Sequence, residues 1–227
     1  MHRLQQHILH QLITNPTRRY ADLKPSDVEG NLFMYHLRCL MKEGIVEKRS
    51  DGLYQLTSKG KVYVDRLSLK SFTPRMQPRI VTLMAIRGTD GRLLMYRRRK
   101  QPLINMIGFP YGKIHLGETI KEAAERELRE KTGLSADLKH IGDGYANTFE
   151  NGEPISQIMF HLFIGNNPSG ELRKDSSAGE SIWLDESQLK GDDIMPNVVH
   201  ILSHVNKYDG SFFFTELNHH LNQTRLV

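Results

Sequence analysis

The sequence predicts an α+β protein with two domains, residues 1–70 and 80–227, joined by a linker at 71–79. The linker is predicted because the segment LKSFTPRMQPR holds two prolines, which restrict the backbone and interrupt regular structure. Before this segment the apolar residues follow helical spacing and then a short hairpin pattern, whereas after it they alternate as in strands. Each segment is long enough to bury a hydrophobic core.

The composition is that of a folded, soluble protein, with 38% hydrophobic and 25% charged residues. No apolar run approaches the roughly 18 residues that a membrane span requires, and MHRLQQHILHQLI lacks the apolar core of a signal peptide. We therefore expect a cytoplasmic protein with no membrane partner. Its one cysteine, Cys39, excludes an intramolecular disulfide and a cysteine-based zinc site.

Charge is distributed unevenly along the chain. Residues 1–79 contain 14 Lys and Arg against 7 Asp and Glu, a balance of +7, whereas residues 80–227 contain 17 and 19, a balance of −2. This asymmetry predicts that the first segment binds a polyanion. The alternative is an ordinary solvated surface.

The first segment has the pattern of helices followed by a hairpin. Apolar residues recur at helical spacing in LQQHILHQLI and in VEGNLFMYHLRCLMKEG. Ser26 or Asp27 is placed to cap the second helix, and Gly44 to end it. The runs IVEKRS and LYQLTS then flank Asp51-Gly52, a dipeptide favoured in hairpin turns.

The stretch FMYHLRCLMKEGIVEKRSDGLYQLTSKG resembles the recognition helix and wing of bacterial and archaeal winged helix-turn-helix transcription regulators, and the resemblance covers residues 1–70. It implies that the helix enters the major groove of double-stranded DNA. The side chains expected to reach base edges are Asn31, Met34, Tyr35 and Arg38. Those suited to phosphate contact are Arg18, Arg19, Lys48 and Arg49. The alternative is a domain for dimerisation or protein binding, and a homodimer is one option because such regulators often dimerise.

The second segment opens with a predicted hairpin, RIVTLMAIRG and RLLMYRRRK around Thr89-Asp90-Gly91. Farther on, Thr119 and Glu122 form a capping box, which predicts a helix to about Thr132 that Gly133 ends. On this helix Glu127, Glu130 and Lys131 lie on neighbouring parts of one face. Two carboxylates beside a glycine-containing loop suit a hard divalent cation, Mg²⁺ or Mn²⁺.

The stretch GKIHLGETIKEAAERELREKTGL, Gly112 to Leu134, matches the pattern G-x5-E-x7-R-E-U-x-E-E-x-G-U, with U aliphatic, at eight of its nine specified positions. It resembles the box of the Nudix family. The resemblance implies an α/β/α sandwich around a mixed sheet, and metal-dependent cleavage of a nucleoside diphosphate linked to another moiety. It assigns catalysis to Glu127 and Glu130, and metal binding to the Gly112 carbonyl, Glu127, Glu130 and residue 131, with Asp175 as a further carboxylate. Glu118 and Arg126 are expected to pair and brace the loop against the helix.

Basic residues at the end of the predicted hairpin are candidates for phosphate binding. The run comprises Arg97, Arg98, Arg99 and Lys100. We predict substrate contacts from Arg97, Arg99 and Lys131, the alternative being a solvated strand end. The pair His219 and His220 is predicted to lie on the surface, since no other ligand stands at metal-binding spacing.

Lys131 is the departure from the family pattern. An ammonium does not coordinate a cation and repels it by roughly 4 kcal/mol at about 4 Å and an effective dielectric near 20. Lys131 can instead pair with Glu127 or help to retain a diphosphate. Two functions follow: a regulator whose Nudix domain senses a nucleotide or phosphorylated metabolite with reduced or absent hydrolysis, or an active hydrolase with an accessory winged helix. The sequence leaves open whether the protein is an enzyme.

Overall fold

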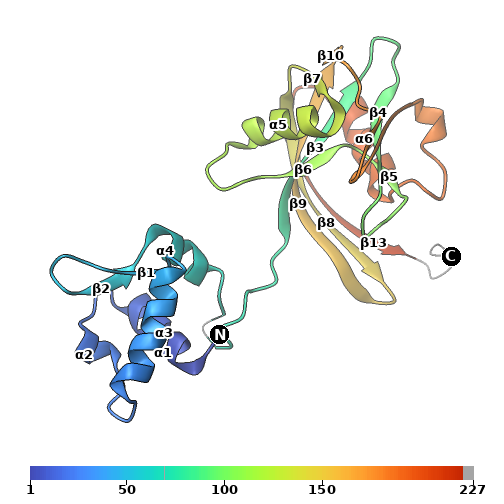
Figure 1. The fold of residues 1–227 in the computed structure, drawn as a ribbon. Coiled ribbons are helices and arrows are strands. Elements are labelled where there is room, and N and C mark those ends of the chain that lie inside the picture. Colours follow the sequence, from blue (N-terminus) through green and yellow to red (C-terminus); the bar gives the residue numbers. More distant parts are fainter. Residues whose placement is uncertain (69, 222–227) are drawn as a thin grey trace. The chain divides into compact units, whose positions relative to one another are not determined.

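The computed structural model describes residues 1–68 and 70–221, which form two compact units, Met1–Met76 and Gln77–Val227 (Figure 1). Each unit has a buried apolar core of its own. No helix within the described ranges is both long and apolar enough to cross a membrane.

In its described residues, the first unit consists of helices and one hairpin. Its elements are α1 (Arg3–Thr14), α2 (Tyr20–Leu23), α3 (Gly30–Lys42), β1 (Val46–Lys48), β2 (Tyr54–Leu56) and α4 (Ser58–Asp65). Ile8 and Leu9 of α1 and Phe33 and Leu37 of α3 are fully buried in one cluster. Since burying each such side chain stabilises by about 1.5–3 kcal/mol, the apolar stripes of α1 and α3 hold this unit together.

Helix α3 begins later than the sequence predicts. Its N-cap is Glu29 rather than Ser26 or Asp27. The expectation was wrong because Lys24 Nζ donates to the carbonyls of Pro25 and Val28, at 3.0 and 2.8 Å, and holds this segment in a turn. The predicted stop is confirmed, because Gly44 follows the helix with a φ of +70°, which favours glycine.

The predicted hairpin of the first unit is also present. Strands β1 and β2 pair antiparallel around Asp51-Gly52, and Gly52 has a φ of +85°. Arg18 exchanges two backbone hydrogen bonds with Tyr54, at 3.0 and 2.8 Å. This bridge ties the segment after α1 to the edge of the hairpin.

The second unit is built on a mixed sheet. Its strands are β3 (Arg79–Arg87), β4 (Leu93–Arg98), β5 (Ile107–Gly108), β6 (Tyr111–Lys113), β7 (Leu134–Ser135), β8 (Lys139–Glu150), β9 (Glu153–Asn166), β10 (Ser169–Gly170), β11 (Asp175–Ser176), β12 (Gly179–Leu184) and β13 (Phe213–Leu221). Its helical elements are α5 (Ile120–Thr132), the short 3-10 helix η1 (Glu186–Gln188) and α6 (Asn197–Asn206). Among the described residues, nine strands form one sheet in the order β11-β12-β4-β3-β9-β8-β13, with β5 on β4 and β6 on β3. The pairs β3–β9 and β8–β13 are parallel and the others antiparallel, which confirms the predicted mixed sheet.

The two longer helices of this unit cover opposite faces of the sheet (Figure 1). Along β3, Leu83 and Ala85 pack in the cluster that contains α6, whereas Met84 and Ile86 pack in the cluster that contains α5. This alternation is that of a strand buried on both faces. The sheet thereby places α5, the helix predicted to carry the carboxylates, directly over β3 and β6.

Candidate functional site

Helix α5 has the boundaries that the sequence predicts. The Thr119 hydroxyl accepts from the Glu122 N–H at 3.2 Å, and the Glu122 carboxylate accepts from the Thr119 N–H at 2.8 Å. Gly133 ends the helix with a φ of +74°. These local contacts fix which residues of α5 face the sheet.

Glu127 lies buried between α5 and β6. Only 8% of the surface of this residue is exposed. A Cβ added to Gly112 of β6 would lie 1.9 Å from Glu127 Cγ. Gly112 is therefore required by the close approach of the Glu127 side chain.

Arg126 braces the loop before α5. Its Nε donates to Glu118 Oε1 at 2.6 Å and its Nη2 to Glu118 Oε2 at 3.0 Å. Nη2 also donates to the Lys113 carbonyl at 2.9 Å. The bonds from Arg126 and from the His115 N–H hold the pKa of Glu118 at about 2. The structure thus pairs the two residues that the sequence assigned to a brace.

Lys131 turns toward Glu127 rather than toward solvent. Its ammonium lies 3.7 Å from Glu127 Oε2, and its side chain is 19% exposed. The same ammonium lies 4.3 Å from the ring centroid of Tyr111 and 5.3 Å from that of Tyr96. Burial lowers the pKa of Lys131, and Glu127 opposes that shift. Two tyrosines and a carboxylate thus hold this ammonium in place.

The carboxylates assigned to a metal are otherwise engaged or apart. Arg126 Nη1 lies 3.0 Å from Glu127 Oε1 and 3.3 Å from Glu130 Oε2, so Glu127 is paired with a cation at each oxygen. Asp175 pairs instead with Arg99. Within residues 1–68 and 70–221, Glu127, Glu130 and Asp175 do not bring three ligand atoms within 4.8 Å of one another. In this structure their charges are neutralised by Arg126, Lys131 and Arg99.

Two of the predicted phosphate ligands are engaged by acidic side chains. Arg97 Nη1 lies 3.1 Å from Asp193 Oδ2, and Arg99 is the partner of Asp175. The arginine between them, Arg98, is the buried one, at 7% exposure, and donates to the Tyr111 hydroxyl. The alternation of side chains along a strand separates Arg98 from its two neighbours. The run of basic residues shows this alternation in the sequence, and it distinguishes Arg98 from Arg97 and Arg99, the residues predicted to bind phosphate.

Tyr111, whose ring the Lys131 ammonium contacts, is also part of the lining of a cavity. Its polar lining includes Arg79, Arg98, Tyr111, Asn197 and His219. Arg98 Nε and His219 Nε2 are buried and have no hydrogen-bond partner among the described groups. Buried polar atoms without partners are costly, so these two favour a ligand with hydrogen-bonding groups.

His219 is not the surface residue that the sequence predicted. It lines this cavity, and burial lowers its pKa, with His200 and His220 adding to the shift. His220 is exposed, as predicted, and its ring stacks on Phe149 at 5.0 Å between centroids. Parallel pairing of β13 with β8 places His219 beside Thr148, a position that spacing in the sequence does not reveal.

Most of the DNA-contact candidates lie on the surface of the first unit. Asn31, Tyr35 and Arg38 are exposed and follow one stripe of α3, and Tyr35 is 63% exposed. Met34 is an exception, because it packs against the core of this unit. Of the remaining candidates, Arg19 precedes α2, and Lys48 and Arg49 lie at the hairpin; all three are exposed. Arg49 pairs with Asp51 at 3.0 Å. Arg18 is half-buried, and its Nε has no hydrogen-bond partner among the described groups.

Comparison with known proteins identifies the family of the second unit. The model of the NUDIX domain matches residues 76–202. An ADP-ribose pyrophosphatase of Methanocaldococcus jannaschii is 27% identical over 62% of this chain and 83% of its own length. An oxidized purine nucleoside triphosphate hydrolase of Danio rerio is 32% identical over 52% of this chain and 76% of its own. The chain belongs to the Nudix family.

A solved structure shares the fold of the second unit. The crystal structure of a NUDIX hydrolase from Nitrosomonas europaea superposes with a TM-score of 0.50 at 18% identity, covering 67% of this chain and 86% of that one. Together with the mixed sheet covered by α5 and α6, this similarity identifies the fold as that of the Nudix family.

Proposed function

We propose that the protein is a cytoplasmic transcription regulator, in which the Nudix domain binds a nucleoside-diphosphate-type ligand and hydrolyses it slowly or not at all. The observation that carries this proposal is the position of the Lys131 ammonium, 3.7 Å from Glu127 and against Tyr111. Metal-assisted hydrolysis requires a cation that activates water and neutralises the diphosphate. An ammonium neutralises charge but activates no water.

The ligand class follows from the groups around Tyr111. The Lys131 ammonium and the Arg98 guanidinium both lie against this tyrosine, and the cavity lined by Arg98, Asn197 and His219 begins beside it. In the proposed complex the diphosphate lies next to the two cations, and the attached nucleoside is directed toward the residues that line the cavity. The relative from M. jannaschii is named for ADP-ribose, which makes ADP-ribose the first ligand to test.

The proposed DNA-binding unit is residues 1–70, read as a winged helix-turn-helix. The order of α1, α2, α3 and the β1–β2 hairpin supports this interpretation. The exposed stripe of Asn31, Tyr35 and Arg38 supplies groups for base edges, and Lys48 and Arg49 at the hairpin supply phosphate contacts. The surplus of basic residues in residues 1–79 favours double-stranded DNA as the partner. The binding form that we propose is a homodimer, since regulators of this type often dimerise.

The ligand half is tested with the unmodified protein. ADP-ribose is incubated with the chain and Mg²⁺ or Mn²⁺, products are quantified, and the melting temperature is measured on the same preparation. Stabilisation without turnover supports the proposal. Turnover at about 1 s⁻¹ or faster, which is ordinary for an enzyme, overturns the regulator with an inactive site.

The DNA half is tested by removing two charges. Arg38→Ala with Lys48→Ala should reduce the affinity for a duplex of about 30 base pairs by tenfold or more and flatten its salt dependence. The matched control removes Lys61 and Arg66, two exposed basic residues on and after α4. Equal losses in both double variants would show that net charge, and not the α3 and hairpin surface, accounts for binding.

An active hydrolase is the second candidate. Glu130 favours it, since its side chain is 61% exposed and its ion pair with Arg126 can be exchanged for a cation that the ligand brings. In that case the first unit is an accessory module. Metal-dependent turnover of ADP-ribose together with unchanged DNA affinity in the Arg38 and Lys48 variant would decide for this function.

A further inference from the structure

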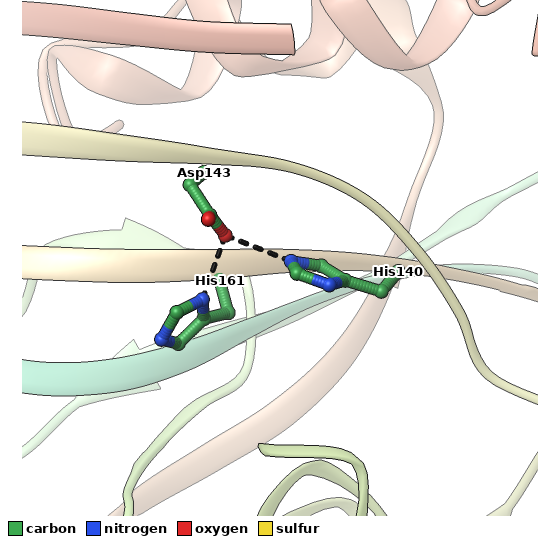
Figure 2. Close-up of side chains that lie close together, drawn as sticks. All are labelled: His140, Asp143 and His161. Atoms are coloured by element: carbon green, nitrogen blue, oxygen red, sulfur yellow. Dashed lines mark hydrogen bonds and ion pairs between the residues drawn. The ribbon is translucent and has the colours of Figure 1, made fainter. Parts of the chain in front are cut away.

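A second polar cluster lies on the sheet away from the Nudix box. His140 Nε2 lies 2.8 Å and His161 Nδ1 lies 2.6 Å from Asp143 Oδ1. Figure 2 shows both rings turned toward this one carboxylate. Among the residues that the structure describes, these three side chains each offer one ligand atom, and the three atoms lie within 4.8 Å of one another.

A β-bulge in β8 builds this cluster. His140 pairs with Phe163 of β9, Gly142 with Leu162, and Asp143 with His161, so Ile141 is an extra residue. In a regular strand, residues three apart face opposite sides, and the bulge returns Asp143 to the side of His140. The register with β9 then sets His161 directly opposite Asp143. The bulge thus brings together three side chains that are not adjacent in the sequence.

The surroundings hold the rings and leave the cluster within reach of solvent. The His140 ring stacks on Phe163, at 4.9 Å between centroids, and meets the edge of Phe212 at 5.1 Å. The side chains of His140, Asp143 and His161 are 24%, 20% and 14% exposed. Lys139 lies on the other face, where its ammonium is 5.1 Å from the Tyr208 ring centroid. The Lys139 ammonium is therefore directed away from the cluster.

We propose that His140, Asp143 and His161 form a binding site for a borderline divalent cation of the Zn²⁺ class, separate from the Nudix box. Two imidazole nitrogens and one carboxylate oxygen are ligands that such ions prefer, and three protein ligands leave a position for water or another ligand. Bonds of about 2.0–2.2 Å in a tetrahedron place ligand atoms about 3.4 Å apart, within the spread of this cluster. When the cation binds, each imidazole ligates through the ring nitrogen that faces Asp143 and carries its proton on its other nitrogen.

The test uses the full chain freed of metal by a chelator and titrated with Co²⁺, whose visible absorption reports nitrogen and oxygen ligands, and with Zn²⁺ in competition. One equivalent should bind in the presence of millimolar Mg²⁺, which hard oxygen sites prefer. His161→Ala should weaken binding at least tenfold. Asp143→Asn keeps the shape and an acceptor oxygen, so it should fold normally and weaken binding by a similar factor.

The matched control is the pair His200 and His204, whose Nε2 atoms are 3.2 Å apart on α6. Replacing both with Ala should leave the single equivalent and its affinity unchanged. If the His200 and His204 variant loses the cation while His161→Ala retains it, the site is on α6 and the proposal is wrong. Failure of the unmodified chain to bind Co²⁺ or Zn²⁺, or binding within twofold of normal in Asp143→Asn, overturns it as well.

Discussion

Replacing Lys131 tests whether its ammonium stands in for a metal. At 3.7 Å and an effective dielectric near 20, the attraction between Lys131 and Glu127 is about 4 kcal/mol before the cost of desolvation. Because both side chains are under one fifth exposed, little of this attraction is screened. Lys131→Met, which keeps the length but not the charge, should lower the free energy of unfolding by about 1–3 kcal/mol.

Lys131→Glu restores the carboxylate of the family pattern. Without metal it should be less stable than Lys131→Met, because two carboxylates then meet beside Arg126. With Mg²⁺ at tenfold its dissociation constant, binding stabilises by about 1.4 kcal/mol, which raises the melting temperature by roughly 3–6 °C for a domain of this size. The unmodified protein and Lys131→Met should respond to Mg²⁺ by less than about 1 °C.

The assay is thermal unfolding followed by tryptophan fluorescence. The single tryptophan of the chain, Trp183, lies on β12, so its signal reports the unit Gln77–Val227 and not the other unit. Ionic strength is matched with and without Mg²⁺. Equal stabilisation of all three proteins by Mg²⁺ would refute the idea that Lys131 keeps a cation out. Undiminished stability of Lys131→Met would refute a net contribution from the ion pair.

Three further predictions follow from the same site. Arg98→Ala should weaken binding of ADP-ribose at least tenfold, since a charged hydrogen bond contributes about 1.5–3 kcal/mol, as isothermal titration calorimetry can measure. Gly112→Ala should destabilise the Nudix unit by about 1–3 kcal/mol, because its Cβ would meet Glu127 at 1.9 Å. Glu118, with its folded pKa lowered from 4.5 to about 2, contributes stability above pH 4.5 that is lost as pH falls toward 2. The melting temperature of Glu118→Gln should therefore lie below that of the unmodified protein at pH 6 and converge with it on acidification.

Two controls separate these effects from a general loss of charge. Arg97→Ala removes an arginine of the same strand that pairs with Asp193, and should leave the affinity for ADP-ribose within about twofold. Glu125→Gln removes an exposed carboxylate from the same helix as Arg126. If the melting temperature of Glu125→Gln depends on pH as that of Glu118→Gln does, the ion pair of Glu118 with Arg126 is not the cause of the pH dependence.

The parts of the fold that the sequence predicted are those fixed by neighbours in the chain. Helix α5 has its capping box at Thr119 and Glu122 and its stop at Gly133 within one short segment, and the Asp51-Gly52 turn is equally local. Such signals act over a few residues, so a sequence displays them directly. The start of α3 was missed because the lysine that holds the preceding turn, Lys24, acts through its side chain and not through a capping pattern.

The site depends on contacts that the sequence does not display. Tyr96 and Tyr111 meet Lys131 only because β4 and β6 both flank β3, and His219 reaches the cavity only through parallel pairing of β13 with β8. The cluster at Asp143 needs a bulge, which shifts every later side chain to the other face. Strand register and bulges are set by the packed sheet as a whole, so these residues could not be placed from spacing alone.

The charge at position 131 also predicts how ligand binding responds to removal of metal. A carboxylate that holds a divalent cation carries a net single positive charge, and so does the Lys131 ammonium. A diphosphate would therefore meet the same local charge here as in a metal-loaded site, while the water activation that a metal supplies is lost. The affinity of the unmodified protein for ADP-ribose should accordingly change by less than twofold when EDTA replaces Mg²⁺, whereas Lys131→Glu should lose most of its affinity in EDTA and recover it with Mg²⁺. A tenfold loss in EDTA for the unmodified protein would show that a bound cation, and not the ammonium held by Tyr96 and Tyr111, neutralises the diphosphate.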